Sequence, residues 1–75
     1  MSAEYVVVIE KSESGFGAYV PDLPGCVAVG ESREETLQLV REAIQLHVAS
    51  LHEAGEAVPP PTSTAERVSV NVAAA

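Results

Sequence analysis

The side chains that could take part in catalysis are few: one cysteine, two histidines and a small set of carboxylates. Cys26 and a histidine can on paper form a nucleophile and its base. However, Cys26 lies in the apolar run Gly-Cys-Val-Ala-Val, where a cysteine usually behaves as a small buried hydrophobic residue. His47 and His52 would lie about 140° apart around a helix, so they cannot form the i, i+4 pair of a metal-binding helix. We therefore expect no catalytic residue.

Metal-dependent cleavage of a phosphodiester is the enzyme activity that the carboxylates leave open. Glu10, at the end of the first apolar run, and Asp22, in a proline-rich turn, could together hold a divalent cation. Asp22 also has a simpler interpretation, because a short carboxylate in a turn can accept hydrogen bonds from nearby backbone amides. The interiors of the expected strands carry no other acidic residue. We expect no metal and no cofactor, with a weak nuclease using Glu10 and Asp22 as the alternative.

Length and charge limit the remaining possibilities. The chain has 75 residues, which we interpret as a single domain over residues 1–75, and 47% of them are hydrophobic. A domain this small buries only about 60% of its unfolded surface, so association with other chains would supply missing burial. The net charge of −7 disfavours direct binding to nucleic acid. It suits a partner with a basic surface, although the charge can also serve only to keep the protein soluble.

Hydrophobic periodicity predicts one helix and several strands. Four segments rich in β-branched or alternating apolar residues are expected to be strands: residues 4–11, 16–21, 26–30 and 66–72. Helical spacing predicts a helix over residues 33–54, with Ser32 and Glu35 as a capping box and Gly55 after its end. The fold class is then α+β in the order β-β-β-α-β, an antiparallel sheet covered on one face by one long helix. Both faces of the first strand are apolar, so another copy or a partner protein should cover the second face.

Three short motifs occur in a defined order along the chain. The link between the second and third expected strands reads PDLPGC, where two prolines and Gly25 favour a stiff turn. The sequence G-E-S then precedes the helix, and G-E-A-V-P-P-P follows it. With these motifs the chain resembles the HicB-like family of antitoxin domains from about Glu4 to Val72.

This resemblance implies a partial RNase H-like or double-stranded-RNA-binding-like fold and an antitoxin function. The chain would bind and neutralise a HicA-type toxin, a small RNA-cleaving protein, by masking its basic RNA-binding surface and catalytic histidine. The expected contacts lie in the turn and the acidic helix start: Pro21, Asp22, Leu23, Pro24, Gly25, Glu31, Glu34 and Glu35. Many members of that family carry a DNA-binding domain after this one. The chain resembles a short form that lacks it, so we expect no direct binding to nucleic acid.

Assembly and location complete the expectations. Apolar residues on both strand faces and over a wide arc of the helix predict a homodimer or a dimer of dimers. No apolar run approaches the ~20 residues of a membrane span, and no basic segment precedes the first apolar run as in a signal peptide. We therefore expect a cytoplasmic protein that does not bind membranes. An orphan homo-oligomeric binding module without a toxin is the remaining alternative.

Overall fold

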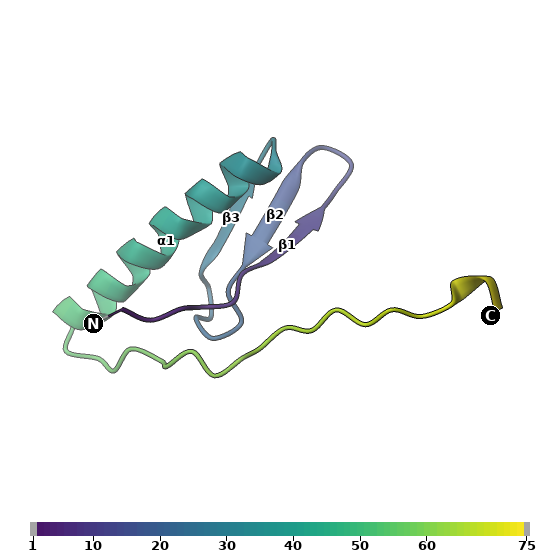
Figure 1. Ribbon diagram of the computed structural model, residues 1–75. Coiled ribbons are helices and arrows are strands. Elements are labelled where there is room, and N and C mark those ends of the chain that lie inside the picture. Colours follow the sequence, from purple (N-terminus) through teal and green to yellow (C-terminus); the bar gives the residue numbers. More distant parts are fainter. Residues whose placement is uncertain (1, 75) are drawn as a thin grey trace.

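Three short strands and one long helix form the body of the molecule, and an extended C-terminal segment leaves it (Figure 1). The computed structural model describes residues 2–74. In chain order the elements are β1 (Val8–Lys11), β2 (Phe16–Tyr19), β3 (Val27–Gly30), α1 (Arg33–Glu53) and the 3-10 helix η1 (Val72–Ala74). The α+β class predicted from the sequence is confirmed, as is the order of three strands followed by one long helix.

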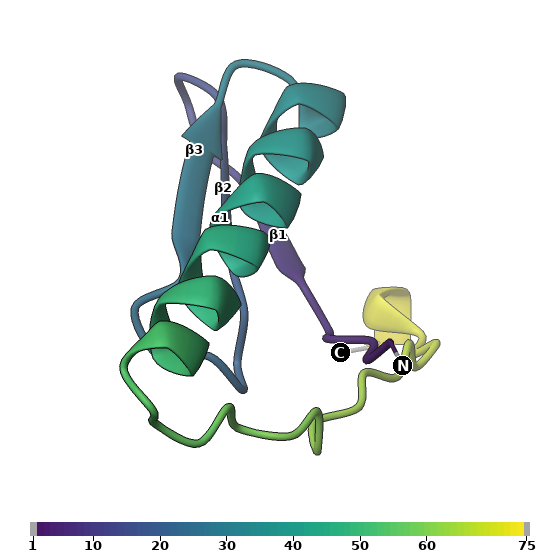
Figure 2. The same cartoon turned by 90° about the vertical axis from the view of Figure 1, so that its left-hand side faces the viewer.

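The strands form one antiparallel sheet in the order β1-β2-β3. Val8 pairs with Tyr19, which pairs with Val27, whereas Ile9 pairs with Ala18. Because successive side chains point to opposite faces of a strand, this register places the first row on one face and the second row on the other. α1 lies across the sheet as a second layer, on the face that carries the buried Ala18 (Figure 2).

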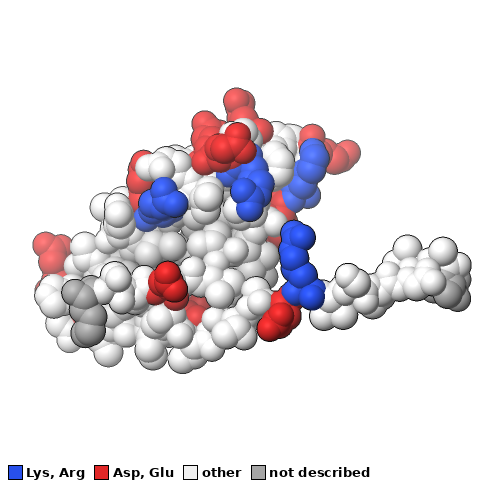
Figure 3. All heavy atoms as spheres, viewed as in Figure 1, with Lys and Arg blue, Asp and Glu red and all other residues white. Residues whose placement is uncertain are grey.

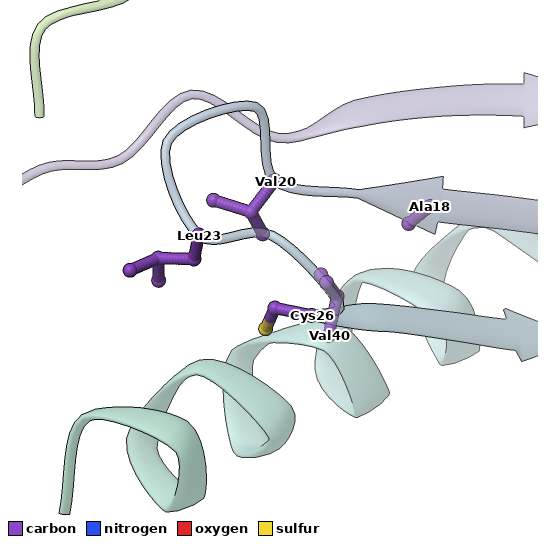
Figure 4. Close-up of a cluster of buried hydrophobic side chains, with 5 residues drawn as sticks. All are labelled: Ala18, Val20, Leu23, Cys26 and Val40. Atoms are coloured by element: carbon purple, nitrogen blue, oxygen red, sulfur yellow. The ribbon is translucent and has the colours of Figure 1, made fainter. Parts of the chain in front are cut away.

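The hydrophobic core is small and lies where α1 meets the sheet and the turn after β2. Figure 4 shows its buried apolar side chains: Ala18, Val20, Leu23, Cys26 and Val40. Leu23 and Val40 are fully buried, at 0% exposure. Cys26 is buried as its apolar run predicted, and burial raises the pKa of its thiol. The thiolate that nucleophilic chemistry requires is therefore disfavoured at this position.

Side-chain and backbone hydrogen bonds define the start of α1. The Ser32 hydroxyl oxygen accepts a hydrogen bond from the Glu35 amide at 3.0 Å. The Glu35 carboxylate in turn accepts one from the Glu31 amide at 2.6 Å, one residue earlier than in the usual capping box. The fully buried Thr36 donates its hydroxyl proton to the Ser32 carbonyl at 2.7 Å. The predicted cap is thus present, and it satisfies backbone groups that the first turn leaves free.

The end of α1 is set by Gly55, which has a φ of +72°. The amides of Gly55 and Glu56 donate to the carbonyls of His52 and Leu51, at 3.1 and 2.9 Å. These two bonds form a Schellman motif, which favours glycine at the left-handed position. The helix therefore ends at Glu53, one residue before the predicted boundary.

α1 carries apolar side chains beyond those that face the sheet. Leu37, Ile44 and Val48 pack against the core, whereas Leu46 is 72% exposed and Leu39 is 39% exposed. The wide apolar arc predicted from the sequence is therefore present, and its outer part is uncovered. Among residues 2–74, no helix is both long enough and apolar enough to cross a membrane.

The first strand is shorter than predicted because its partner ends early. Pairing begins at Val8, opposite Tyr19, the last residue of β2. Beyond Tyr19 the chain turns away at Pro21, so residues 2–7 are extended but pair with no strand in the described part of the chain. Tyr5 instead donates its hydroxyl proton to the carbonyl of Pro59 at 2.6 Å, which ties the N-terminal segment to the segment after α1.

The fourth strand, predicted over residues 66–72, is not formed. Every residue from Thr64 to Ala73 is exposed, and this part of the chain runs away from the body (Figure 1). We refer to residues 64–72 as the C-terminal arm. The radius of gyration, 15.0 Å, exceeds the ~11 Å expected for a compact chain of this length, because the arm extends the molecule. Alternating apolar residues predict an extended conformation, but a strand also requires a neighbour with which to pair.

Two glycines test the contact between the β1–β2 hairpin and the end of β3. A Cβ atom added at Gly15 would lie 2.5 Å from the Gly30 carbonyl oxygen, whereas one added at Gly17 would meet only the Ala28 oxygen at 4.0 Å. We expect Gly15→Ala to lower the free energy of unfolding by about 1–3 kcal/mol, because backbone must shift. Gly17→Ala should change it by less than about 1 kcal/mol. Urea denaturation measures both, and equal stabilities would contradict the close approach.

Candidate functional site

The PDLPGC segment forms two consecutive β-turns between β2 and β3. The Leu23 amide donates to the Val20 carbonyl at 3.1 Å, and the Cys26 amide donates to the Leu23 carbonyl at 3.0 Å. A third bond, from the Val20 amide to the Cys26 carbonyl at 3.2 Å, closes the loop. Each turn has a proline at its second position, and Gly25, with a φ of +85°, occupies the third position of the second turn. The stiff turn predicted from the sequence is therefore confirmed, and we call it the double turn (residues 20–26).

The double turn directs its side chains in different directions. Leu23 points into the core and is fully buried (Figure 4). Pro21, Pro24 and Gly25 are exposed. Of the five turn residues predicted to contact a partner, Leu23 is therefore unavailable, and the three exposed residues form the outer surface of the turn.

Asp22 holds the segment that follows α1. Its carboxylate accepts four hydrogen bonds, from the amides and the hydroxyl groups of Thr62 and Ser63, at 2.9 to 3.1 Å. We call this arrangement the Asp22 clasp. The bond from the Ser63 amide is the largest influence on the carboxylate, and together with the other three it holds the pKa of Asp22 below its ordinary value of 3.8, against the opposing effect of desolvation. The sequence predicted hydrogen bonds to nearby amides, but the amides used are 40 residues away.

The two carboxylates of the nuclease hypothesis are not brought together. Glu10 pairs with Gly17 near the hairpin end of β2, whereas Asp22 follows the opposite end of that strand. Within residues 2–74 there is no group of three or more histidine, cysteine or acidic side chains that could hold a metal ion. Glu10 and Asp22 therefore cannot share a cation in this fold, because the length of β2 separates them.

Acidic side chains gather at the start of α1. Glu31 and Glu34 are exposed, whereas the carboxylate of Glu35 is engaged in the helix cap. Figure 3 shows acidic and basic side chains around this end of the molecule, where the β1–β2 hairpin also lies, and few charged atoms over the middle of the same face. The free acidic groups at the helix start are therefore Glu31 and Glu34, not all three of the predicted residues.

The double turn and the acidic helix start lie at opposite ends of β3. Four strand residues separate them, a distance of about 13 Å along the strand. β3 is an edge strand, and Val27 and Val29 on it are 61% and 77% exposed. We call the exposed edge of β3, with the double turn at one end and Glu31 and Glu34 at the other, the β3 surface. Val27 and Val29 lie between the accessible predicted contact residues at the two ends of β3.

The face of the sheet turned away from α1 is apolar and open. Val8, Tyr19 and Val27 form a row directly across the three strands, and Tyr19 is 42% exposed. The next outward row consists of Glu10, Gly17 and Val29, so it carries a charge on β1, no side chain on β2 and an apolar side chain on β3. The sequence predicted an uncovered second face from the first strand alone. The structure extends that face to β2 and β3.

Together these features define a small α+β domain with one helix on one face of a three-stranded sheet and an open apolar surface on the other. The family described as the HicB_like antitoxin of bacterial toxin-antitoxin system matches residues 5–72. This match includes nearly the whole chain, so the protein belongs to that family of antitoxins.

Relatives of the chain occur in bacteria and archaea. A UPF0150 protein of Helicobacter pylori is 53% identical over 44 residues, which are 59% of this chain and 61% of that protein. A UPF0150 protein of Thermoplasma acidophilum is 36% identical over 69 residues, which are 91% of this chain and 97% of that protein. The matched part is thus less than two thirds of the first relative and nearly all of the second.

A solved structure shares the fold. A chain of the HicA3 and HicB3 toxin-antitoxin complex is similar to this chain with a TM-score of 0.67 and 32% sequence identity. The alignment covers 79% of this chain and 70% of that chain. The resemblance to the HicB-like family predicted from the turn and helix motifs is therefore confirmed by the family match and by the fold.

The Asp22 clasp predicts a pH dependence. The pKa of Asp22 is lower in the folded state than its ordinary value of 3.8. Stabilisation by the clasp is therefore complete well above pH 3.8 and is lost as the pH falls through the lower, folded-state pKa. We expect the amide NMR signals of Thr62 and Ser63 to titrate with a midpoint below 3.8.

Two substitutions separate the clasp from a general effect of charge. Asp22→Asn should abolish the titration of the Thr62 and Ser63 amides and speed their hydrogen exchange, because an amide side chain has one acceptor oxygen instead of two. Glu10→Gln removes the same charge from a carboxylate that accepts none of these bonds and should change neither. Slow exchange that persists in Asp22→Asn would show that other contacts hold the segment.

Proposed function

We propose that this chain is an antitoxin that binds and neutralises a HicA-type RNA-cleaving toxin in the cytoplasm. The observation that carries the proposal is its similarity, over 79% of its length, to a chain of a HicA–HicB complex. Membership of a family of antitoxins supports the same role. The chain then acts as a binding protein and not as an enzyme. It covers the surface of its partner instead of changing a substrate.

Charge complementarity supports a toxin as the partner. A protein that cleaves RNA needs basic side chains to hold phosphate groups. The chain carries 11 acidic and 4 basic side chains, for a net charge of −7. Complementary potentials of this kind speed the encounter of two proteins and select against wrong partners. The same charge makes direct binding of this chain to nucleic acid unfavourable.

The contact that we propose is the β3 surface. Val27 and Val29 supply exposed apolar area, and interfaces generally concentrate such area at their centre with polar groups around it. Glu31 and Glu34 lie at one end, where they can meet basic side chains of the toxin. The rigid double turn lies at the other end and needs little ordering on binding, which lowers the entropic cost of association.

Three of the residues predicted as contacts make structural contacts within this chain. Leu23 is buried, Asp22 is occupied by the clasp, and Glu35 is occupied by the helix cap. We propose that they hold the β3 surface in shape without touching the toxin.

A homodimer, or a dimer of dimers, is the assembly that we propose. Large apolar side chains remain exposed on the sheet, on α1 and on the C-terminal arm: Tyr19, Val27, Val29, Leu39, Leu46, Val68, Val70 and Val72. Monomeric soluble proteins rarely leave extended apolar surface open. A second copy would cover part of it while the β3 surface remains free for a toxin.

The direct test is RNA cleavage by a small basic HicA-type protein, if one is encoded beside this chain. That protein should lose its activity when an equimolar amount of this chain is added, and the two should elute as a stable complex. Unchanged cleavage, or the lack of such a neighbour, would contradict the antitoxin proposal. The chain would then fit the alternative of a homo-oligomeric binding module without a toxin.

The proposed contact at the β3 surface predicts how charge changes alter the rate of association with the toxin. Glu31→Gln/Glu34→Gln should slow association with the toxin several-fold at low salt, because electrostatic steering is weakened. The effect should vanish near 1 M salt, where the Debye length is about 3 Å. The control is Glu53→Gln/Glu56→Gln, an equal change of charge about 30 Å away at the other end of α1. Surface plasmon resonance measures both, and equal rates for the two variants would place the contact elsewhere.

A further inference from the structure

The C-terminal arm has the sequence of a strand without a neighbour, and it is extended up to Asn71, before η1 begins at Val72 (Figure 1). Val68, Val70 and Val72 alternate with polar residues and are 79%, 73% and 78% exposed. Their side chains would share one face of an extended chain. The arm pairs with no strand within the described residues 2–74. Such a segment leaves both its backbone hydrogen-bonding groups and an apolar face to water.

The outer edge of β1 also has no neighbouring strand with which to pair. β1 is an edge strand, and the residues before it are extended but unpaired. Proteins usually protect exposed edges with charged residues or proline. Glu10 and Lys11 provide charge at the far end of β1, but the stretch Tyr-Val-Val-Val-Ile over residues 5–9 has neither charge nor proline. This part of the edge can accept another strand.

An apolar groove lies beside the same edge. One wall is formed by Ala3, Tyr5 and Val7, and the other by α1, with the apolar Leu37, Val40 and Ile44 beside the polar Arg41 and Gln45. Apart from the fully buried Val40, the larger apolar side chains of these walls are only partly buried where they pack against the core, and Ala3 is exposed. α1 therefore leaves the β1 side of the sheet incompletely covered. The groove presents apolar side chains against which the valines of the arm could pack.

The base of the arm lies close to this edge. A second groove is lined on one side by residues 4–6 and on the other by residues 63–65. The Asp22 clasp holds Ser63 in place, and the chain beyond it is directed away from its own sheet (Figure 1). The arm is about 30 Å long when extended, enough to span residues 4–11, which extend over about 26 Å.

We propose that the arm of one protomer adds as a strand to the β1 edge of a second copy, reciprocally, in a two-fold dimer. The valine face of the arm then fills the groove between the N-terminal segment and α1 of the partner. A second copy is the occupant that the structure favours, because every chain offers one unpaired arm and one unpaired edge, and a two-fold exchange satisfies both at once. This inference rests on the homodimer proposed above and assigns the surface that forms it.

The test compares two full-length variants with the same added charge. Val68→Asp/Val70→Asp places two carboxylates on the face that would be buried, whereas Ser69→Asp/Asn71→Asp places them on the opposite face. Light scattering at micromolar concentration should give the mass of a dimer for the wild type and the control. The valine variant should be a monomer, with its dissociation constant raised by ~100-fold or more, because unpaired charges are costly to bury. Circular dichroism confirms that each variant is folded.

Hydrogen exchange of the arm separates the remaining outcomes. The amides of residues 66–72 should exchange slowly in the wild-type dimer and rapidly after dilution to monomer. A dimer that persists in Val68→Asp/Val70→Asp would overturn the exchange of arms and leave the homodimer intact through another surface. A monomeric wild type with a protected arm would show that the arm pairs with its own β1, and a monomer with an unprotected arm would overturn the homodimer as well. None of these results depends on the toxin.

Discussion

The burial of Leu23 is the constraint on which the arrangement of the molecule depends. Two prolines and one glycine fold residues 20–26 into the double turn, and Leu23 at its centre enters the core beneath α1. The bond from the Val20 amide to the Cys26 carbonyl starts the pairing of β2 with β3. The same fold of the loop turns Asp22 outward, where it holds the chain that returns from α1. One short loop therefore positions the sheet, the helix and the C-terminal segment.

A three-stranded sheet with one covering helix has two free edges and one open face, and the two edges differ. β3 runs between a rigid turn and a pair of free carboxylates, so one of its ends is acidic. β1 follows an uncharged apolar stretch and borders a groove against α1. A chain of 75 residues buries only a small core, so contacts with partners supply much of the burial that it needs. The unpaired strand edges and the exposed apolar face therefore indicate where partners bind, just as the core explains stability.

Features determined by neighbouring residues could be predicted from the sequence, and features determined by distant residues could not. The helix was located to within a residue, because Ser32, Glu35 and Gly55 act within one turn of its ends. The fourth strand and the full length of the first depend on which segments lie side by side, and apolar alternation carries no such information. The bonds between Asp22 and residues 62–63 were missed for the same reason. The hydroxyl residues that follow the three prolines were the available signal, since they can donate to a distant carboxylate.

The two tyrosines lie in different environments, and the chain has no tryptophan. Tyr5 is partly buried and bonded to the Pro59 carbonyl, whereas Tyr19 lies on the open face of the sheet at 42% exposure. The intrinsic ultraviolet emission of the protein therefore comes from one ring that senses the attachment of the segment after the helix and one that senses contact with water. An added quencher in solution reaches the second ring more readily, so the protein carries two optical reporters of its own without any label.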